Sequence, residues 1–438
     1  MKHTFKGGIH PYEGKELTMD CEIKEYLPVG EIVIPLSQHI GAPAKAIVKK
    51  GDRVLVGQMI AEAQGFVSAN IHSSVSGTVK TIESRLTSSG QKVMSIVIDN
   101  DKQFDEVDYV NNPKNIEELE RDEIIEAIKL AGVVGMGGAG FPTHVKLSPK
   151  NIDDIDTILV NASECEPYLT SDYRRLLEES DVIIDGLRIV LKAFKNAKGI
   201  IAIEDNKPEA IKIMKDKAKQ YEDIIVNVMP TKYPEGAERQ LIYANTGRYI
   251  SSKMLPADAG CVVHNVDTIH AIYEAVMLGK PLFRRVMTIT GDAANAPCNL
   301  LISVGTSYSE IIEAAGGLKD GVKKLIAGGP MMGKAIYSTD IPATKSASAI
   351  LALSQDEVSM YEPSACIRCG RCVSVCPGRV MPNKLADLAV NNDIDGFLKY
   401  NGMECCECGC CSYVCPAKRH LTQTIAGTRK LVLANRKK

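Results

Sequence analysis

Short apolar runs separated by turns form the first regular pattern along the chain. Between residues 31 and 100, β-type runs such as Ile32-Val33-Ile34 and Val93–Ile98 alternate with glycine-containing turns such as Ser88-Ser89-Gly90. Short strands with regular turn signals predict a β-rich barrel or sandwich over residues 31–100. Residues 1–30 carry glycine and proline without any period, so we expect an irregular lead-in there.

The pattern then becomes helical and afterwards alternates between strand and helix. Asp122–Ala131 follows an acidic linker and has apolar residues at i, i+3 and i+4, with acids in its first turn. The apolar run Thr157–Val160 opens a strand–helix alternation that continues to a strand at Thr288–Gly291. This alternation predicts an α/β domain with a largely parallel sheet over residues 116–295.

The C-terminal third divides into three segments. Residues 296–340 read as strand, short helix, strand and a Gly-Gly-Pro loop, which predicts a small β-grasp-like unit. A connection at 343–353 leads to a cysteine-rich domain at 355–420. Residues 421–438 form a basic, helix-like tail that suits an anionic membrane surface, an acidic partner, or simply a solvated terminal helix.

Two cysteine runs carry the most specific chemistry of the chain. Each reads C-x2-C-x2-C-x3-C-P, and together they hold most of the cysteines. This is the spacing of bacterial ferredoxins with two [4Fe–4S] clusters, in which the fourth cysteine of each run ligates the other cluster. We therefore expect a cluster 1 and a cluster 2 with interchanged fourth ligands. Their ligands are Cys366, Cys369, Cys372 and Cys415 for cluster 1, and Cys405, Cys408, Cys411 and Cys376 for cluster 2.

The alternative for these runs is a pair of structural zinc sites. Zinc sites usually combine two close pairs of cysteines, which is not the spacing here. Cys406 and Cys410 fall outside the pattern, and an exchange of ligand role between Cys405 and Cys406 stays open. Because the fourth ligands are interchanged, the two runs must clasp each other. Residues 355–420 are thus predicted to form one pseudo-symmetric, ferredoxin-like helical domain.

A glycine-rich loop is the second informative stretch. Four glycines fall within six residues (Gly135, Gly137, Gly138 and Gly140), and Pro142 suits the first turn of a following helix. Amides at such a helix start, with Lys146 one turn in, predict an anion site for the phosphate of a nucleotide or flavin. The loop follows a helix and not a strand, which excludes the Rossmann fingerprint. A glycine-rich turn without a ligand is the alternative.

Polar residues follow the buried strand at Thr157–Val160. Asn161, Glu164 and Glu166 come directly after it. In α/β folds, ligands bind at the carboxyl ends of the strands. Cys165, between the two glutamates, is compatible with simple packing.

Composition narrows the setting. A net charge of −2 over 438 residues gives no basic field for nucleic acid. We expect no transmembrane segment, because no apolar run approaches the ~18–20 residues that span a bilayer. The first residues lack the apolar core of a signal peptide. Cysteines gathered in one domain indicate metal binding in a reducing compartment, and hence a cytoplasmic redox protein.

The α/β region resembles a known family. The glycine loop, Asn161–Pro167, Tyr233–Gly236 and Asn265–Thr268 resemble, in this order, the flavin-carrying subunit of respiratory NADH dehydrogenase, which binds FMN and NADH in a Rossmann-like domain. The resemblance implies an FMN site, with Glu164 and Glu166 as catalytic candidates beside the nicotinamide. The implied cofactor contacts are Gly135, Gly137, Gly138, Gly140 and Lys146 for the FMN phosphate and ribityl chain, Asn161 for the isoalloxazine, Asn265 and Thr268 for the rest of the FMN site, and Phe141 for stacking on NADH. Met136 stands where that family has arginine, and Ser163 where it has aspartate.

The order of domains resembles a second family along the whole chain. Residues 48–79 are similar to lipoate- or biotin-carrying barrel-sandwich domains, but the hairpin near Gly65-Phe66 lacks the carrier lysine, so we expect a docking or spacer element. The full order, ending in an SLBB-like β-grasp unit and a two-cluster domain, resembles the RnfC family, which forms one subunit of the Rnf electron transport complex.

That resemblance implies a peripheral, cytoplasmic, NAD(H)-reacting subunit of an ion-translocating ferredoxin:NAD⁺ oxidoreductase. FMN would exchange hydride with NAD(H), and two [4Fe–4S] clusters would relay electrons to or from the membrane subunits and the ferredoxin-type subunit. The alternatives are a soluble flavin reductase for another acceptor such as cobalamin, and a non-catalytic electron-relay scaffold.

Overall fold

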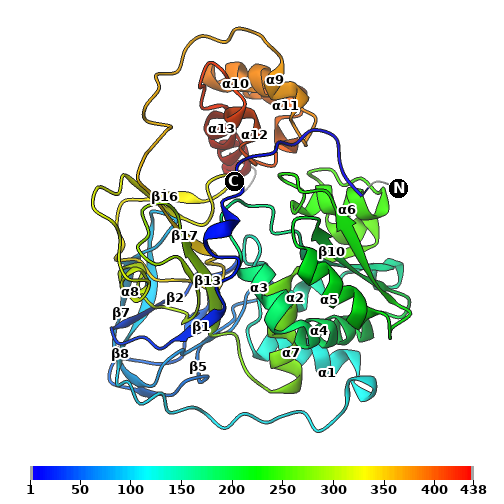
Figure 1. Cartoon of the computed structure of the whole chain (residues 1–438). Helices are drawn as coiled ribbons and strands as arrows, with labels where there is room; N and C mark the ends of the chain where they lie inside the picture. Colours follow the sequence, from blue (N-terminus) through cyan, green and yellow to red (C-terminus); the bar gives the residue numbers. More distant parts are fainter. Residues whose placement is uncertain (1–2, 436–438) are drawn as a thin grey trace.

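A computed structural model describes residues 3–435 of the chain, and its α/β domain forms the green and cyan part of Figure 1. The sheet has the strand order β11-β10-β9-β12 and is parallel throughout, as the alternation predicts. Its strands are β9 (Thr157–Ala162), β10 (Lys198–Glu204), β11 (Ile224–Met229) and β12 (Cys261–Asn265). Its helices are α1 (Arg121–Leu130), α2 (Thr143–Lys146), α3 (Ser171–Glu178), α4 (Ser180–Lys192), α5 (Pro208–Ala218), α6 (Glu238–Thr246) and α7 (Val266–Met277).

Both faces of this sheet are covered, which explains the continuous apolar run of β9. Ile158 and Val160 pack into the large core shared with α4 and α7, and Leu159 packs into a separate core beneath α6. A strand buried on both faces carries apolar residues at successive positions. The carboxyl ends of the four strands therefore meet at one edge, where the polar residues after β9 lie.

The barrel-sandwich domain consists of two small sheets around their own core. One sheet has the order β2-β8-β7-β4 and the other β3-β5-β6. The strands are β2 (Ile32–Pro35), β3 (Lys45–Ala46), β4 (Arg53–Val54), β5 (Met59–Glu62), β6 (Ile71–His72), β7 (Gly77–Leu86) and β8 (Lys92–Asn100). The hairpin between β5 and β6 is the one that lacks the carrier lysine.

The β-grasp unit is larger than the sequence predicts. Its sheet has the order β1-β14-β13-β17-β15-β16 and carries α8 (Tyr308–Ala314). The strands are β1 (Ile23–Tyr26), β13 (Arg284–Thr290), β14 (Cys298–Ser303), β15 (Lys324–Ala327), β16 (Lys334–Ile336) and β17 (Ala349–Leu353).

Three expectations are therefore corrected. The lead-in contains a strand (β1), the strand assigned to the α/β domain (β13) pairs in the β-grasp sheet, and the connection at 343–353 contains β17. Each of the three strands has a partner that is far away in sequence: Ile23 of β1 pairs with Asn299, and Thr288 of β13 pairs with Ala349 of β17. The pattern within a short strand cannot indicate which sheet it joins.

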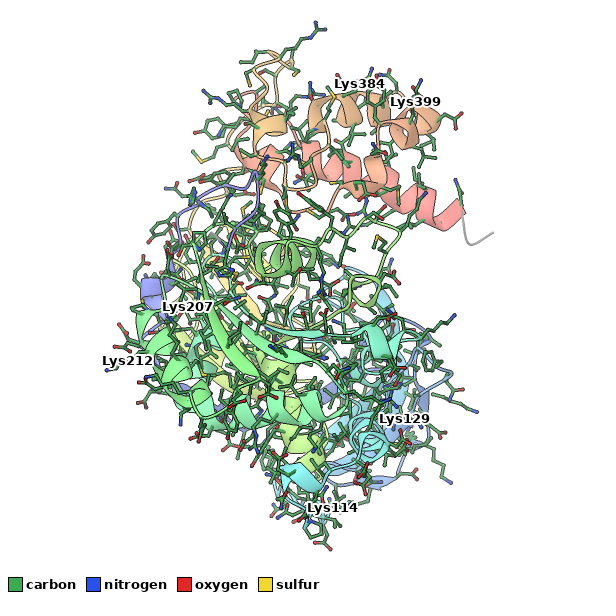
Figure 2. All side chains as sticks on the ribbon, turned by 90° about the vertical axis from the view of Figure 1, so that its right-hand side faces the viewer. Lys114, Lys129, Lys207, Lys212, Lys384 and Lys399 are labelled. Carbon is green, nitrogen blue, oxygen red and sulfur yellow. The ribbon has the colours of Figure 1, made fainter. Side chains whose placement is uncertain are left out.

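The C-terminal domain is helical and forms one end of the molecule. Its helices are α9 (Arg371–Ser374), α10 (Pro382–Val390), α11 (Ile394–Lys399), α12 (Cys410–Tyr413) and α13 (Leu421–Asn435). Figure 2 shows Lys384 and Lys399 at this end and Lys114 and Lys129 at the other. Single 3-10 turns complete the described chain: η1 (Lys15–Leu17), η2 (Ile116–Glu118), η3 (Ile152–Asp154), η4 (Pro256–Ala259) and η5 (Gly402–Glu404).

The predicted basic tail is partly a core element. Leu421 and Ile425 of α13 are buried in the same core as Leu385 and Phe397. The expectation of a merely solvated helix is therefore wrong for α13, whereas a contact of the tail with an anionic membrane surface or an acidic partner stays a prediction. Residues 436–438 lie outside the described residues. Within residues 3–435, no helix has both the length and the hydropathy to cross a bilayer.

Candidate functional site

The N-terminal lead-in runs between the C-terminal domain and the α/β domain (Figure 1). The amide of Gly8 donates to the carbonyl of Val375 at 2.8 Å, and Ile9 and Tyr233 exchange two backbone hydrogen bonds at 2.9 Å. Gly7 has a φ of 90°, and a Cβ there would lie 2.9 Å from the carbonyl oxygen of Val375. The irregular segment thus ties the two domains together and continues toward the strand-end edge.

Lys15, on η1, organises the turn that follows β9. Its side chain is buried, with 8% of its surface exposed, and its ammonium donates to the carbonyls of Glu164 (2.8 Å), Glu166 (3.2 Å) and Leu169 (2.6 Å). Burial lowers the pKa of Lys15, and the charge of Glu164 opposes this shift. From the other side, the buried ammonium of Lys207 donates to the carbonyl of Ser163 at 2.6 Å. Sequence patterns predicted a role for neither lysine. Lys15 lies in a segment without any period, so no pattern pointed to it.

Lys15→Met is expected to lower the free energy of unfolding by about 3 kcal/mol, because three buried carbonyls would lose their donor. The turn at residues 163–169 should also become more mobile. Denaturant unfolding and amide hydrogen exchange of the full chain measure these effects. Lys49→Met on the barrel surface is a matched control that should change neither. An unchanged unfolding free energy for Lys15→Met would contradict this role.

Glu164 supports the start of α3. It adopts a φ of 48°, and its carboxylate accepts the amides of Asp172 (2.8 Å) and Tyr173 (3.3 Å). Burial raises the pKa of Glu164, and the nearby charges of Lys15 and Lys207 oppose that rise. A carboxylate at the first turn of a helix satisfies free amides and interacts favourably with the helix dipole.

Glu166 joins the strand-end turn to the β-grasp unit. Its Oε1 accepts the amides of Met331 (2.6 Å) and Met332 (3.0 Å), in the loop between β15 and β16. A Cβ on Gly329 would lie 2.1 Å from the Cγ of Glu166, so this approach requires glycine. Both glutamates thus hold backbone segments in place, and their contact with a flavin or nicotinamide stays a prediction.

The glycine loop is closed and pinned to α7. The amide of Gly135 donates to the carbonyl of Phe141 at 2.9 Å, and the amide of Met136 donates to the hydroxyl of Thr268 at 3.0 Å. A Cβ on Gly137 would lie 2.8 Å from the Cβ of Asn265, whereas a Cβ on Gly138 would meet open space. Met136, at the position of the family's arginine, is buried in the domain core.

The structure corrects the expectation that a helix start behind the glycine loop forms an anion site. α2 has only four residues, Thr143–Lys146, so it is too short to provide a helical anion site. Pro142 precedes it and does not lie in its first turn. The ammonium of Lys146 donates to the carbonyl of Val263 at 2.9 Å and lies 3.7 Å from the carboxylate of Glu238. Val263 is the middle residue of β12, so Lys146 lies beside this edge strand of the sheet.

Several buried polar atoms near this edge have no protein partner. In the described part of the chain these include the hydroxyls of Ser163 and Thr143 and both ring nitrogens of His264, which is 1% exposed. Burial lowers the pKa of His264 to about 3, with a further contribution from Lys146, so its imidazole is neutral. Buried polar groups are normally paired. Ser163 follows β9, His264 lies near the end of β12, and Thr143 follows the glycine loop. Their unpaired polar atoms therefore fit a polar ligand at this edge.

The two predicted asparagines have defined partners. Asn161 donates to the carbonyl of Gly236 at 2.8 Å, and Asn265 donates to the carboxylate of Asp172 at 2.6 Å. The oxygen of Asn265 also accepts the amide of Asp267 and caps α7. Sequence reasoning found both asparagines and missed His264. The available signal was the position of His264, a polar residue at the end of an otherwise apolar strand.

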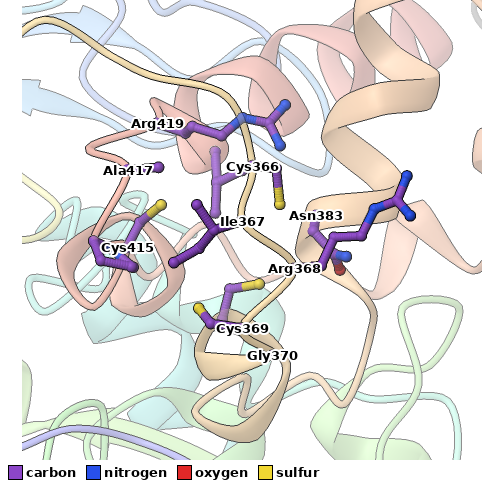
Figure 3. Close-up of a pocket in the computed structure, with 12 residues that line it drawn as sticks. Cys366, Ile367, Arg368, Cys369, Gly370, Asn383, Cys415, Ala417 and Arg419 are labelled. Carbon is purple, nitrogen blue, oxygen red and sulfur yellow. The ribbon is translucent and has the colours of Figure 1, made fainter.

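The four predicted ligands of cluster 1 line one cavity. Cys366, Cys369, Cys372 and Cys415 surround it together with Asn383, and Figure 3 shows Cys415 facing the first cysteine run. The last cysteine of the second run therefore lies with the first three of the first run, as the interchange of ligands requires.

One predicted ligand of cluster 2, Cys408, packs against the α/β domain, whereas Cys376, Cys405 and Cys411 pack in or against the core of the C-terminal domain. Burial raises the pKa of Cys376 to about 11, and the nearby thiols of Cys406 and Cys411 contribute to the rise. Across residues 3–435, no three His, Cys, Asp or Glu side chains converge on one point as a single metal ion requires.

A small group of packed apolar side chains connects the strand-end turn with the predicted site of cluster 2. Ile9, Tyr233, Cys408 and Cys410 are buried together, and Cys165 and Met331 pack against them. The hydroxyl of Tyr233 donates to the carbonyl of Cys408 at 2.7 Å. No residue from the cluster 1 cavity belongs to this group. Within the described chain, Cys408, a predicted ligand of cluster 2, thus lies nearer to the α/β edge than the cluster 1 cavity does.

Family models match all four parts of the chain. An RnfC barrel sandwich hybrid domain matches residues 3–103, a Nuo51 FMN-binding domain 128–274, an SLBB domain 286–335 and a 4Fe-4S binding domain 360–381. The SLBB match includes most of β13, in agreement with the observed sheet. The 4Fe-4S match covers the first cysteine run.

The similarity to curated proteins extends over the whole chain. The C subunit of the Na(+)-translocating ferredoxin:NAD(+) oxidoreductase complex of Acetobacterium woodii is 43% identical over 100% of this chain and 99% of its own length. The chain belongs to the RnfC family. The C subunit of the proton-translocating ferredoxin:NAD(+) oxidoreductase complex of Clostridium ljungdahlii is 46% identical over 97% of this chain and 93% of its length.

Solved structures show a similar fold for part of this RnfC-family chain. An NAD⁺-reducing [NiFe]-hydrogenase in the air-oxidized state superposes with a TM-score of 0.50 at 20% identity. The match covers 62% of the RnfC-family chain and 53% of the hydrogenase chain. At this identity the match concerns the fold alone. Family membership identifies the chain as an electron-transfer subunit of an ion-translocating oxidoreductase complex.

Proposed function

We propose that this chain is the NAD(H)-reacting subunit of its complex, with one FMN and two [4Fe–4S] clusters. The observation that carries the proposal is the junction at Tyr233. It packs between the turn after β9 and the cluster 2 cysteine Cys408, so the proposed flavin edge lies directly against an iron–sulfur site. The four matching parts of the family support the same assignment of cofactors.

The residues at the edge of the sheet fit FMN. Gly138 leaves open space above the glycine loop, and Ser163, Thr143 and His264 offer buried polar atoms without protein partners. We assign the phosphate and ribityl chain to Gly135, Gly137, Gly138, Gly140 and Lys146, with Asn161, Asn265 and Thr268 completing the site. When bound, FMN would exchange a hydride with NAD(H) and single electrons with the clusters. This link is needed because nicotinamide transfers two electrons together, whereas a cluster transfers one.

The chain's own residues orient this exchange. Lys15 and Lys207 hold the turn at 163–169, and Glu166 fixes the β15–β16 loop against it. Phe141 is assigned to stacking on the nicotinamide nucleotide. Tyr233 is buried and packs against Cys165 and Cys408, so it lies between this edge and cluster 2. We infer the electron order FMN, cluster 2, cluster 1, because the cluster 1 cavity lies away from that junction.

Cluster 1 would exchange electrons with the other subunits of the complex. Cys366 and Cys369 are exposed, and Arg368 and Arg371 lie beside them in sequence and are exposed as well. We assign this face to the ferredoxin-type and membrane subunits, with the chain peripheral on the cytoplasmic side of the bacterial membrane. Transport of Na⁺ or H⁺ would take place in those other subunits.

Anaerobic purification of the full chain, with cofactor reconstitution, tests the proposal. We expect about eight irons, by the count for two [4Fe–4S] clusters, together with one FMN per chain. NADH should bleach the absorption of flavin and clusters alike. Iron in that amount without flavin, and no response to NADH, would contradict the proposal and indicate a relay that receives its electrons from another subunit.

A further inference from the structure

The hairpin tip of the barrel-sandwich domain, residues 63–68, lies against the α/β domain. Asn70, just after the tip, donates to the carbonyls of Lys129 and Leu130 at 3.3 Å. Lys345 donates to the carbonyls of both Asn70 (2.8 Å) and Gly132 (2.7 Å) and so joins the two domains. Where a carrier domain would present a mobile lysine, this hairpin is fixed in place.

A second barrel segment, residues 38–42, accompanies the tip to the glycine loop. The amide of Ile40 donates to the carbonyl of Gly140 at 3.3 Å, and a Cβ on Gly140 would lie 2.9 Å from the carbonyl oxygen of Gln38. The amide of Ala42 donates to the carbonyl of Val67 at 3.0 Å, which pairs the two barrel segments. Both segments therefore border the far side of the glycine loop.

The histidine that follows the loop connects to the same tip. His144 lies three residues after Phe141, and the main chain of Phe66 opposes the lowering of its pKa by burial, so the two residues are neighbours. His39 accepts the amide of Ala69 at 3.1 Å and fixes the other side of the hairpin. Phe66 is therefore held close to the loop that ends at Phe141.

The side chains at this border are apolar and exposed. Phe66 is 67% exposed and Ile40 is 47% exposed. A single exposed apolar side chain is ordinary on a protein surface. Here two of them lie on paired segments, both fixed to the rim of the proposed nucleotide site, with Phe141 partly exposed beside them.

We propose that Phe66 and Ile40 form a platform, on the barrel-sandwich domain, for the adenine of NAD(H). The inference rests on the proposed function, because a nicotinamide placed at the strand edge leaves the adenosine half of the dinucleotide to extend outward past the glycine loop. A flat base gains most by stacking on an aromatic face. The barrel would thus supply one wall of the nucleotide site in place of a swinging cofactor.

The test compares NADH with reduced nicotinamide mononucleotide, which lacks the adenosine half. Phe66→Ala in the full, cofactor-loaded chain should raise the KM for NADH about tenfold, the effect of losing one base–aromatic stack. It should leave the KM for the mononucleotide unchanged. Phe66→Trp should restore the wild-type KM, and Ile47→Ala, on the same domain, is a control for removing an exposed apolar side chain.

Calorimetric binding of ADP-ribose, which lacks the nicotinamide, gives a readout independent of turnover. We expect the wild-type chain to bind it and Phe66→Ala to bind it about tenfold more weakly. An equal rise in KM for both reduced substrates, no change for either, or no binding of ADP-ribose by the wild type would overturn the inference. Phe66-dependent binding of ADP-ribose without any NADH oxidation would retain the adenine platform and contradict the proposed function instead.

Discussion

Cys408→Ala is expected to lower the iron content from about eight to about four per chain, because one of the two [4Fe–4S] clusters would lose a ligand. Dithionite should still reduce the remaining cluster 1, but NADH should not. The reason is the position of Cys408 against Tyr233, which makes cluster 2 the only proposed route from the flavin edge. Tyr233 bonds the carbonyl of Cys408 and not its thiol, so the domain contact should persist. Iron and sulfide assays with anaerobic spectra measure these effects.

Cys406→Ala is the matched control. It removes a neighbouring, partly buried thiol that lies outside the cysteine pattern. This variant should keep about eight irons and its reduction by NADH. Loss of iron in Cys406→Ala would contradict the ligand assignment. Full reduction of cluster 1 by NADH in Cys408→Ala would contradict the electron order.

Gly138→Asp is expected to weaken FMN binding about a thousandfold, at about 1.4 kcal/mol per factor of ten, without destabilising the fold. A Cβ at this position meets no atom within 4 Å, so the substitution fits the protein itself. Its carboxylate would face the proposed phosphate position, and two like charges about 4 Å apart repel by about 4 kcal/mol at an effective dielectric of 20. Flavin retained after desalting and FMN titration of the flavin-free chain measure the loss.

Gly427→Asp on α13 is a suitable control, because a Cβ there also meets open space. It should keep its FMN. The thermal midpoint of flavin-free Gly138→Asp should match that of the wild type. Unchanged FMN affinity in Gly138→Asp would place the phosphate away from the glycine loop and contradict the proposed site.

The structure alters the part that several predicted residues play. Glu164 and Glu166 are at the predicted position after β9, but their carboxylates bond backbone amides of α3 and of the β15–β16 loop. Lys146 reaches the middle of β12 from a helix of one turn. Residue type and spacing predict where a side chain lies along the chain, whereas its partners come from elements that are distant in sequence.

Local patterns sufficed where the chemistry itself is local. A ferredoxin turn places three ligands within seven residues, so the cysteine spacing predicted that Cys415 lies with the first run, as it does, whereas the number of clusters stays a prediction. The parallel sheet was also predictable, because strands buried on both faces carry continuous apolar runs. The absence of a lysine from the hairpin near Gly65-Phe66 indicated that the barrel-sandwich domain carries no lipoate or biotin there.

Only the tertiary structure decided how these parts serve one site. Lys15 and β1 lie in a segment without a period, and Lys15 acquires its role through carbonyls about 150 residues away. Tyr233 touches Cys408, and barrel segment 38–42 touches the glycine loop, through contacts that no sequence period encodes. The sequence by itself determined the domains' chemistry and most secondary structure, because these depend on neighbouring residues. The shared site depended on long-range packing, in which each contact joins residues that carry no signal of one another.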